Sequence, residues 1–263
     1  MPSEFLQGAV DAAKQAGELL QAMLPETRAS KQVSFKRNPA DLVTRADRSS
    51  EDLIVGILRR RFPDHGIIAE EGSLHKGDEY RWIIDPLDGT TNFAHGVPLF
   101  AVSIGLEHGG QLVAGVVYHP PMEEMFMADR GMGAFLQKGG ETQRLRVSDV
   151  PAVADSVVAT GLPYDIREVG ANIPQISKLC RIAREVRILG AAALHLAYVA
   201  AGRVEAFWEQ NLNPWDVAAG ILLVTEAGGQ ISHIRGGSFN VDGRDVLASN
   251  GKIHEEMLRL LAG

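Results

Sequence analysis

The sequence is poor in cysteine and contains no long hydrophobic run. Cys180 is the single cysteine among 263 residues, so an intramolecular disulfide and a multi-cysteine zinc site are both excluded. No apolar run approaches the ~20 residues that span a bilayer. The N-terminal segment carries Glu4, Asp11 and Glu18 among its apolar residues, which does not match a secretory leader. We therefore expect a cytoplasmic protein without a membrane segment.

Positive charge is also scarce in this chain. Lysine and arginine together number 26 against 33 aspartates and glutamates, which gives a formal net charge of −7. This balance disfavours an electrostatic grip on nucleic acid. Hydrophobic residues make up 45% of the chain, enough for a sizeable core. An acidic enzyme that handles an anionic substrate needs local cations, and a bound metal can supply them.

The hydrophobic periodicity predicts two kinds of layer. Residues 4–24 have helical spacing, and we expect this helix to cover the outside of a sheet. The central part of the chain predicts an antiparallel sheet, with a hairpin at His108-Gly109-Gly110. Its expected strands are 101–106, 112–119, 124–128, 134–137 and 144–147, and residues 74–80 are expected to form a polar surface loop.

The second half alternates between strands and helices, which favours an α/β layer. A connection that contains proline and aspartate, 148–154, is the best candidate boundary. We therefore divide the chain into an N-terminal α+β half, 1–147, and a C-terminal α/β half, 148–263, fused as one compact unit.

The stretch from Trp82 to Phe93 organises the chain. Its apolar start, 82–84, predicts a buried strand that ends in Asp85 and is stopped by Pro86. Asp88 and Gly89 then predict a turn before a helix that begins near Thr90. Two carboxylates at a strand tip repel each other, whereas free N–H groups beside them favour an anion. A metal cation together with a phosphate satisfies both conditions, although Asp85 and Asp88 could also be ordinary turn and cap residues.

Further acids accompany this motif. Glu70 ends the preceding predicted strand, and Asp216 lies in the first turn of a helix that starts at Asn213-Pro214. Four carboxylates from three segments predict a Mg²⁺ site, with the Leu87 carbonyl as a further ligand. Two such ions could activate a water for in-line attack. Asp47 remains open between a helix N-cap and a role near a metal.

These blocks resemble the inositol monophosphatase family. The matching segments are 41–47, 70–73, 82–93 and 215–229, and the similarity runs over nearly the full length. The resemblance implies a layered αβαβα sandwich of the sugar-phosphatase type, classed as α+β / α/β. It also implies a Mg²⁺-dependent, lithium-sensitive enzyme that acts on a small-molecule phosphate ester as a homodimer.

The resemblance also implies roles for individual residues. The implied metal ligands are Glu70, Asp85, the Leu87 carbonyl, Asp88 and Asp216, with Asp47 near a weaker ion. Glu70 and Thr90, together with Asp88, form the implied catalytic set, in which Glu70 and Thr90 orient the attacking water. The implied substrate contacts are Gly89 and Thr90 for the phosphate, with Ala192, Glu209 and Asp216 on the sugar side. Ala69 and Ala191 depart from the family pattern, which usually has glycine and a hydroxyl residue there, and Ala191 puts one polar substrate contact in doubt.

Our functional hypothesis is hydrolysis of myo-inositol 1-phosphate and related polyol phosphates by direct attack of a metal-activated water. Alternatives within the family are 3′-phosphonucleotides, fructose 1,6-bisphosphate and histidinol phosphate. Glu209 favours a polyhydroxy substrate, because a carboxylate accepts hydrogen bonds from hydroxyl groups. A regulatory protein-interaction role is the alternative outside enzymes. Crowded carboxylates that cost stability without a metal argue against it as the sole function.

Overall fold

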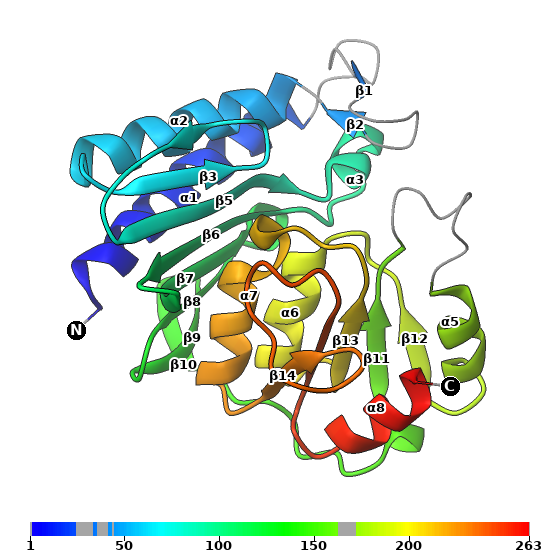
Figure 1. Ribbon diagram of the computed structural model, residues 1–263. Coiled ribbons are helices and arrows are strands. Elements are labelled where there is room, and N and C mark those ends of the chain that lie inside the picture. The colour runs from blue at the N-terminus through cyan, green and yellow to red at the C-terminus, as the bar shows by residue number, and fades with distance from the viewer. Residues whose placement is uncertain (1, 25–33, 36–41, 44, 163–171, 263) are drawn as a thin grey trace.

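A computed structural model describes residues 2–24, 34–35, 42–43, 45–162 and 172–262. The elements stack as helices, a large sheet, helices, a small sheet and outer helices, an αβαβα sandwich (Figure 1). The layered fold that the resemblance implied is confirmed. None of the described helices combines the length and apolar composition that crossing a membrane requires.

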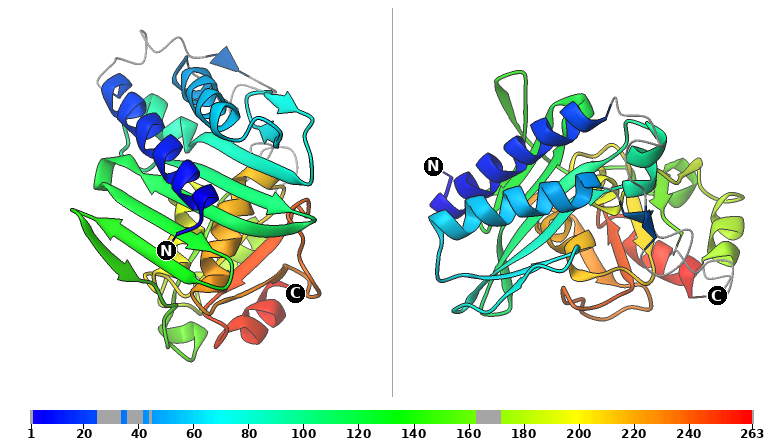
Figure 2. Two further views of the ribbon diagram at one scale, coloured as in Figure 1. Left: turned by 90° about the vertical axis from the view of Figure 1, so that its left-hand side faces the viewer. Right: turned by 90° about the horizontal axis from the view of Figure 1, so that it is seen from above.

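The first layer consists of α1 (Glu4–Met23) and α2 (Arg45–Arg61), which lie side by side over one face of the large sheet (Figure 2). The Ser3 hydroxyl caps α1 by accepting from the Leu6 N–H. Small buried side chains of α1, such as Ala9 and Ala16, allow a close approach to the sheet. The predicted helix and its position are confirmed. Three arginines end α2, where they complement the negative helix terminus.

Over the residues described, the large sheet has eight strands in the order β10-β9-β8-β7-β6-β5-β3-β4, and of these only β3 and β5 pair in parallel. The hairpin predicted at residues 108–110 joins β6 and β7. The strands are β3 (Gly66–Ala69), β4 (Leu74–His75), β5 (Tyr80–Asp88), β6 (Ala101–His108), β7 (Gln111–His119), β8 (Glu124–Asp129), β9 (Gly133–Lys138) and β10 (Glu141–Arg144). A single turn, η1 (Pro120–Met122), separates β7 from β8.

Three boundaries in this sheet differ from the sequence prediction. The strand expected at 144–147 is wrong, because β10 pairs at 141–144 and the chain leaves the sheet afterwards. The expected polar loop at 74–80 contains β4 and the first residue of β5. Pro86 does not end β5, since the strand continues to Asp88. Tertiary pairing outweighs local composition in all three cases.

The middle layer consists of α6 (Ala192–Ala200) and α7 (Pro214–Glu226), which pack between the two sheets. Both helices are apolar around most of their surface, because each faces protein on both sides. The short helix α3 (Thr90–His95) follows β5 at one edge of this layer. Residues 145–156 carry the chain from the first sheet to the second, and they contain η2 (Val153–Asp155) and the proposed domain boundary.

The small sheet is mixed, in the order β12-β11-β13-β15-β14. Its parallel part comes from the alternating segment, whereas β14 and β15 follow each other without an intervening helix and pair antiparallel. Its strands are β11 (Val157–Thr160), β12 (Glu185–Arg187), β13 (Ala206–Glu209), β14 (Gln230–His233) and β15 (Val246–Ser249). The outer layer is α5 (Ile173–Leu179) and α8 (His254–Leu261). A two-stranded ribbon, β1 (Ser34–Phe35) with β2 (Leu42–Val43), completes the described elements.

Candidate active site

A cavity of about 790 Å³ lies where the end of β5 meets the starts of α3, α6 and α7 and the end of β13. All predicted site residues except Asp47 line this cavity, although they come from both halves of the chain. They are Glu70, Asp85, Leu87, Asp88, Gly89, Thr90, Ala192, Glu209 and Asp216. The fold therefore brings together the residues that the sequence motifs singled out.

A bulge in β5 aligns two of the carboxylates. Asp85 pairs with Ser103 and Asp88 pairs with Ala101, so three steps along β5 match two steps along β6. Residues three apart in a regular strand point to opposite faces. The extra residue reverses that alternation, and Asp85 and Asp88 both reach the cavity. The Asp85 carboxylate also accepts the Leu87 N–H at 3.0 Å, which stabilises the bulge.

Burial, and then repulsion between neighbouring acids, raises the pKa values of Asp85, Asp88 and Asp216. Burial raises the pKa of Asp216 to about 8, with a further contribution from Glu70. Burial likewise raises the pKa of Asp88 to about 7, and the pKa of Asp85 lies well above its ordinary value. Glu70 contributes to the Asp85 shift through its charge and a hydrogen bond between the two side chains. Such a cluster favours a cation in place of shared protons.

Asp88 and Asp216 tie the site to the second half of the chain. The two Asp88 oxygens accept the N–H groups of Ala192 and Ala193 at 3.1 and 2.8 Å, so Asp88 caps the start of α6. Asp216 accepts the Asn213 N–H at 2.6 Å in the first turn of α7. The predicted start of α7 at Asn213-Pro214 is confirmed. Two helix N-termini of the middle layer thus point toward the carboxylate cluster.

Helix α2 supports the site from the opposite side. Asp47 is fully buried and accepts the Thr90 hydroxyl at 2.8 Å. The interpretation of Asp47 as an N-cap is wrong, since α2 begins at Arg45. Ser50 donates to the Pro86 carbonyl at 2.8 Å. Glu51 accepts two backbone N–H groups of the turn that follows Glu70. The sequence analysis missed Glu51. Its one signal was that Asp47, Ser50 and Glu51 share a helix face that is otherwise apolar.

Gly89 allows the chain to turn from β5 into α3. Its φ of 91° lies in the left-handed region, where side chains are strained, and a Cβ atom there would meet the Leu99 carbonyl oxygen at 2.8 Å. The tight turn places Thr90 at the start of α3 and on the cavity wall. Asn92 reinforces this corner by donating to the carbonyls of Leu99 and Leu189, both at 2.7 Å.

The far side of the cavity is built from the second half. Glu209 ends β13 and is almost fully buried, and burial raises its pKa well above the ordinary value, with contributions from Asp216 and Asp88. A Cβ atom at Gly161 would overlap the Glu209 carboxylate, so a larger side chain there would displace that group. Several lining residues escaped sequence reasoning because no motif marks them. They are Gly161, Leu162, Ile188, Gln210, Asn211, Leu212 and Arg244.

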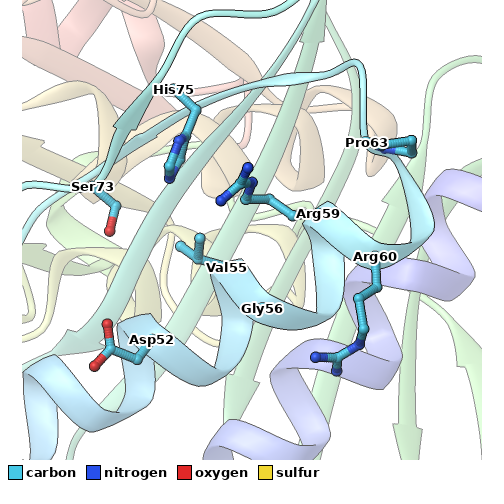
Figure 3. A pocket seen from close by; sticks show the side chains of 8 residues that line it. All are labelled: Asp52, Val55, Gly56, Arg59, Arg60, Pro63, Ser73 and His75. Atoms are coloured by element: carbon cyan, nitrogen blue, oxygen red, sulfur yellow. The ribbon is translucent and has the colours of Figure 1, made fainter.

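A second hollow, on the outer face of α2, has different chemistry (Figure 3). It measures about 520 Å³, and its lining residues are Asp52, Val55, Gly56, Arg59, Arg60, Pro63, Ser73 and His75. None of the predicted site residues belongs to it. The carboxylate-lined cavity is therefore the candidate active site.

The donor set of the cavity fits a hard cation such as Mg²⁺, because it consists of carboxylate oxygens and the backbone of Leu87. The Leu87 side chain is buried in the core, so its backbone faces the cavity. Within the described residues, no three acidic, histidine or cysteine side chains are arranged so that they could hold a metal ion as they stand. The acids instead bond to one another and to backbone N–H groups.

The layered fold and this acidic cavity define a metal-assisted hydrolase of the sugar-phosphatase type. A family model described as the inositol monophosphatase family matches residues 1–262. The chain is 44% identical to the inositol-1-monophosphatase of Mesorhizobium japonicum over 98% of this chain and 96% of the relative. It is 42% identical to the fructose-1,6-bisphosphatase/inositol-1-monophosphatase of Thermotoga maritima, over 88% and 85%.

The solved structures agree with this similarity. The crystal structure of extragenic suppressor protein suhB from Bartonella henselae superposes with a TM-score of 0.92 at 42% identity, covering 98% of each chain. The protein therefore belongs to the inositol monophosphatase family and is a phosphatase.

Proposed function

We propose that this protein is a Mg²⁺-dependent phosphomonoesterase that hydrolyses myo-inositol 1-phosphate and related polyol phosphates. The proposal rests on one observation: Asp85, Asp88 and Asp216, whose pKa values are raised by burial and by neighbouring acids, gather with Glu70 in one cavity with a polar rim. The name of the Mesorhizobium relative supports inositol 1-phosphate as the substrate. The homodimer, the cytoplasmic location and the lithium sensitivity implied by the resemblance belong to the same proposal.

The proposed ligands of Mg²⁺ are Glu70, Asp85, Asp88, Asp216 and the Leu87 carbonyl, with Asp47 near a weaker ion. Magnesium, when bound, neutralises the carboxylates and the phosphate and lowers the pKa of a water molecule. The carboxylate cluster thereby changes from a repulsive arrangement into a binding site for a phosphate ester.

Thr90 and Glu70 orient the attacking water in this proposal. The Thr90 hydroxyl has one proton and two partners, Asp47 at 2.8 Å and the Leu87 carbonyl at 3.1 Å. Because that proton is directed at these acceptors, a lone pair of the Thr90 oxygen can accept a hydrogen bond from a water. Glu70 lines the same cavity and accepts a hydrogen bond from the second proton of the water.

The substrate lies between the two halves of the cavity. The N–H groups of Gly89 and Thr90 at the start of α3 hold the phosphate. Glu209 and Ala192 contact the sugar hydroxyls, while Asp216 faces the leaving oxygen. A raised pKa permits Glu209 to donate as well as accept a hydrogen bond, which suits a hydroxyl partner.

The experiment that tests this function is release of inorganic phosphate from inositol 1-phosphate with and without Mg²⁺. Fructose 1,6-bisphosphate and adenosine 3′,5′-bisphosphate serve as competing substrates. We expect Mg²⁺-dependent release with a preference for inositol 1-phosphate. Asp88→Asn should lower kcat by about 100-fold or more, by comparison with outer-shell variants of metal sites. Absence of release from every ester in the presence of Mg²⁺ would refute the proposal.

A further inference from the structure

We propose that Arg244 binds a second phosphate of the substrate, so that the cavity accepts sugar and polyol bisphosphates as well as monophosphates. This inference rests on the proposed function, because it assumes that the cavity hydrolyses phosphate esters. It assigns the second phosphate to the rim, away from the carboxylates that hold the reacting group.

The strand register places Arg244 on the rim of the cavity. Val246, the first residue of β15, pairs with Glu209, the last residue of β13. Arg244 precedes this pair by two residues and lies over the loop that continues β13. The Leu212 N–H donates to the Arg244 carbonyl at 2.8 Å, and the Asn211 N–H donates to the Asp245 carboxylate at 3.1 Å. One hydrogen bond to the Arg244 backbone and one to the Asp245 side chain therefore hold this segment against the rim loop.

The guanidinium group of Arg244 is available to a ligand. Arginine has five N–H donors. One of them, on Nη2, donates to the Asn211 carbonyl at 3.3 Å. Within the described part of the chain, Arg244 forms no ion pair with a carboxylate, and its side chain is exposed. Its positive charge is thus not neutralised by a neighbouring acid.

The charge of Arg244 contrasts with the rest of the cavity. Of the described residues that line it, Arg244 is the only lysine or arginine, whereas Glu209 and Asp216 lie nearby as acids. A second phosphate on the substrate would meet repulsion from these acids unless a cation balanced it. Arginine matches a phosphate with two parallel N–H donors, which makes it suited to this task.

The cavity also has room for a second group. Its volume of about 790 Å³ lies in the upper part of the range of roughly 300–1,000 Å³ that is usual for small-molecule sites. The Thermotoga relative, 42% identical, bears both a bisphosphatase and a monophosphatase name. A bisphosphate can extend from the carboxylates to the rim, whereas a monophosphate leaves the rim to water.

A pair of substrates that differ only in the second phosphate provides the test. Fructose 1,6-bisphosphate and fructose 1-phosphate would be compared in the wild type and in Arg244→Gln, Arg244→Lys and Arg235→Gln. Arg235 is the matched control, because it is an exposed arginine of the same β14–β15 connection that does not line the cavity. The measured quantity is kcat/KM for each substrate, with KM and kcat reported separately.

We expect Arg244→Gln to lower kcat/KM for the bisphosphate about 10- to 100-fold more than for the monophosphate, mainly through KM. Arg244→Lys should recover part of the loss, because it retains a point charge, and Arg235→Gln should match the wild type. Equal losses on both substrates, or no loss, would overturn the inference. Hydrolysis of inositol 1-phosphate without hydrolysis of the bisphosphate would overturn it and leave the proposed function intact. Failure on all esters would overturn both.

Discussion

Glu51 should control the position of Glu70, although it does not line the cavity. Glu51 is 3% exposed, and its carboxylate accepts the Glu71 N–H at 2.7 Å and the Ser73 N–H at 2.9 Å. Both donors belong to the turn that directly follows Glu70. One buried side chain of α2 therefore holds the end of β3 and the first acid of the site.

The cost of altering Glu51 follows from these two hydrogen bonds. Glu51→Gln keeps one acceptor oxygen but turns an NH₂ group toward a backbone N–H, which leaves a buried donor unpaired at about 1–3 kcal/mol. For a chain of this length, that corresponds to a fall in Tm of roughly 2–12 °C. Glu51→Ala removes both acceptors and should cost up to about twice as much.

The effect on activity should exceed the effect on folding. Outer-shell partners of metal ligands typically contribute 10–100-fold in activity or metal affinity. We therefore expect Glu51→Gln to lower kcat about 10- to 100-fold and to raise the Mg²⁺ concentration required for half-maximal phosphate release. Thermal unfolding and phosphate release across a Mg²⁺ titration measure the two effects separately.

Asp52→Asn is the matched control for this prediction. Asp52 is the next residue of α2, is exposed, and lies beside the outer hollow in Figure 3. The substitution removes the same charge without touching the turn after Glu70. The reasoning is refuted if Glu51→Gln lowers Tm but keeps the wild-type kcat and Mg²⁺ dependence, or if Asp52→Asn reproduces its effects.

Two other predictions concern the acids of the cavity. Without metal, the free energy of unfolding should fall as the pH rises from about 4 to about 8. Burial raises the pKa values of Asp88 and Asp216 from the ordinary 3.8 to about 7 and about 8, so over this range the folded state holds protons that the unfolded state has already released. Thermal unfolding in the presence of a chelator measures this fall, and added Mg²⁺ should raise Tm more at pH 8 than at pH 5. A Tm that stays constant from pH 5 to 8 in the chelator would contradict the raised pKa values of Asp88 and Asp216. Gly161→Ala should raise KM for inositol 1-phosphate about 10-fold, because the added methyl displaces the Glu209 carboxylate, and an unchanged KM would exclude Glu209 from substrate contact.

The sequence by itself determined the elements whose signals are local. The spacing of residues 4–24 identified α1, and the glycines at 109–110 identified the hairpin between β6 and β7. Asn213-Pro214 marked the start of α7, because an N-cap residue and proline have the same role in any helix. The acidic motifs could be recognised for a similar reason, since the order of residue types along the chain carries the chemistry.

The tertiary structure decided how those elements meet. Asp88 contacts the N–H groups of α6 across 104 and 105 residues of sequence, a separation that no local periodicity can indicate. The bulge that aligns Asp85 with Asp88 arises from pairing with β6, so Pro86 by itself suggested a strand end instead. Glu51 and Arg244 lacked any motif, because their significance comes from a turn and a rim loop contributed by other segments. Local propensity acts over a few residues, whereas packing joins segments far apart in the chain, and the site lies where such segments meet.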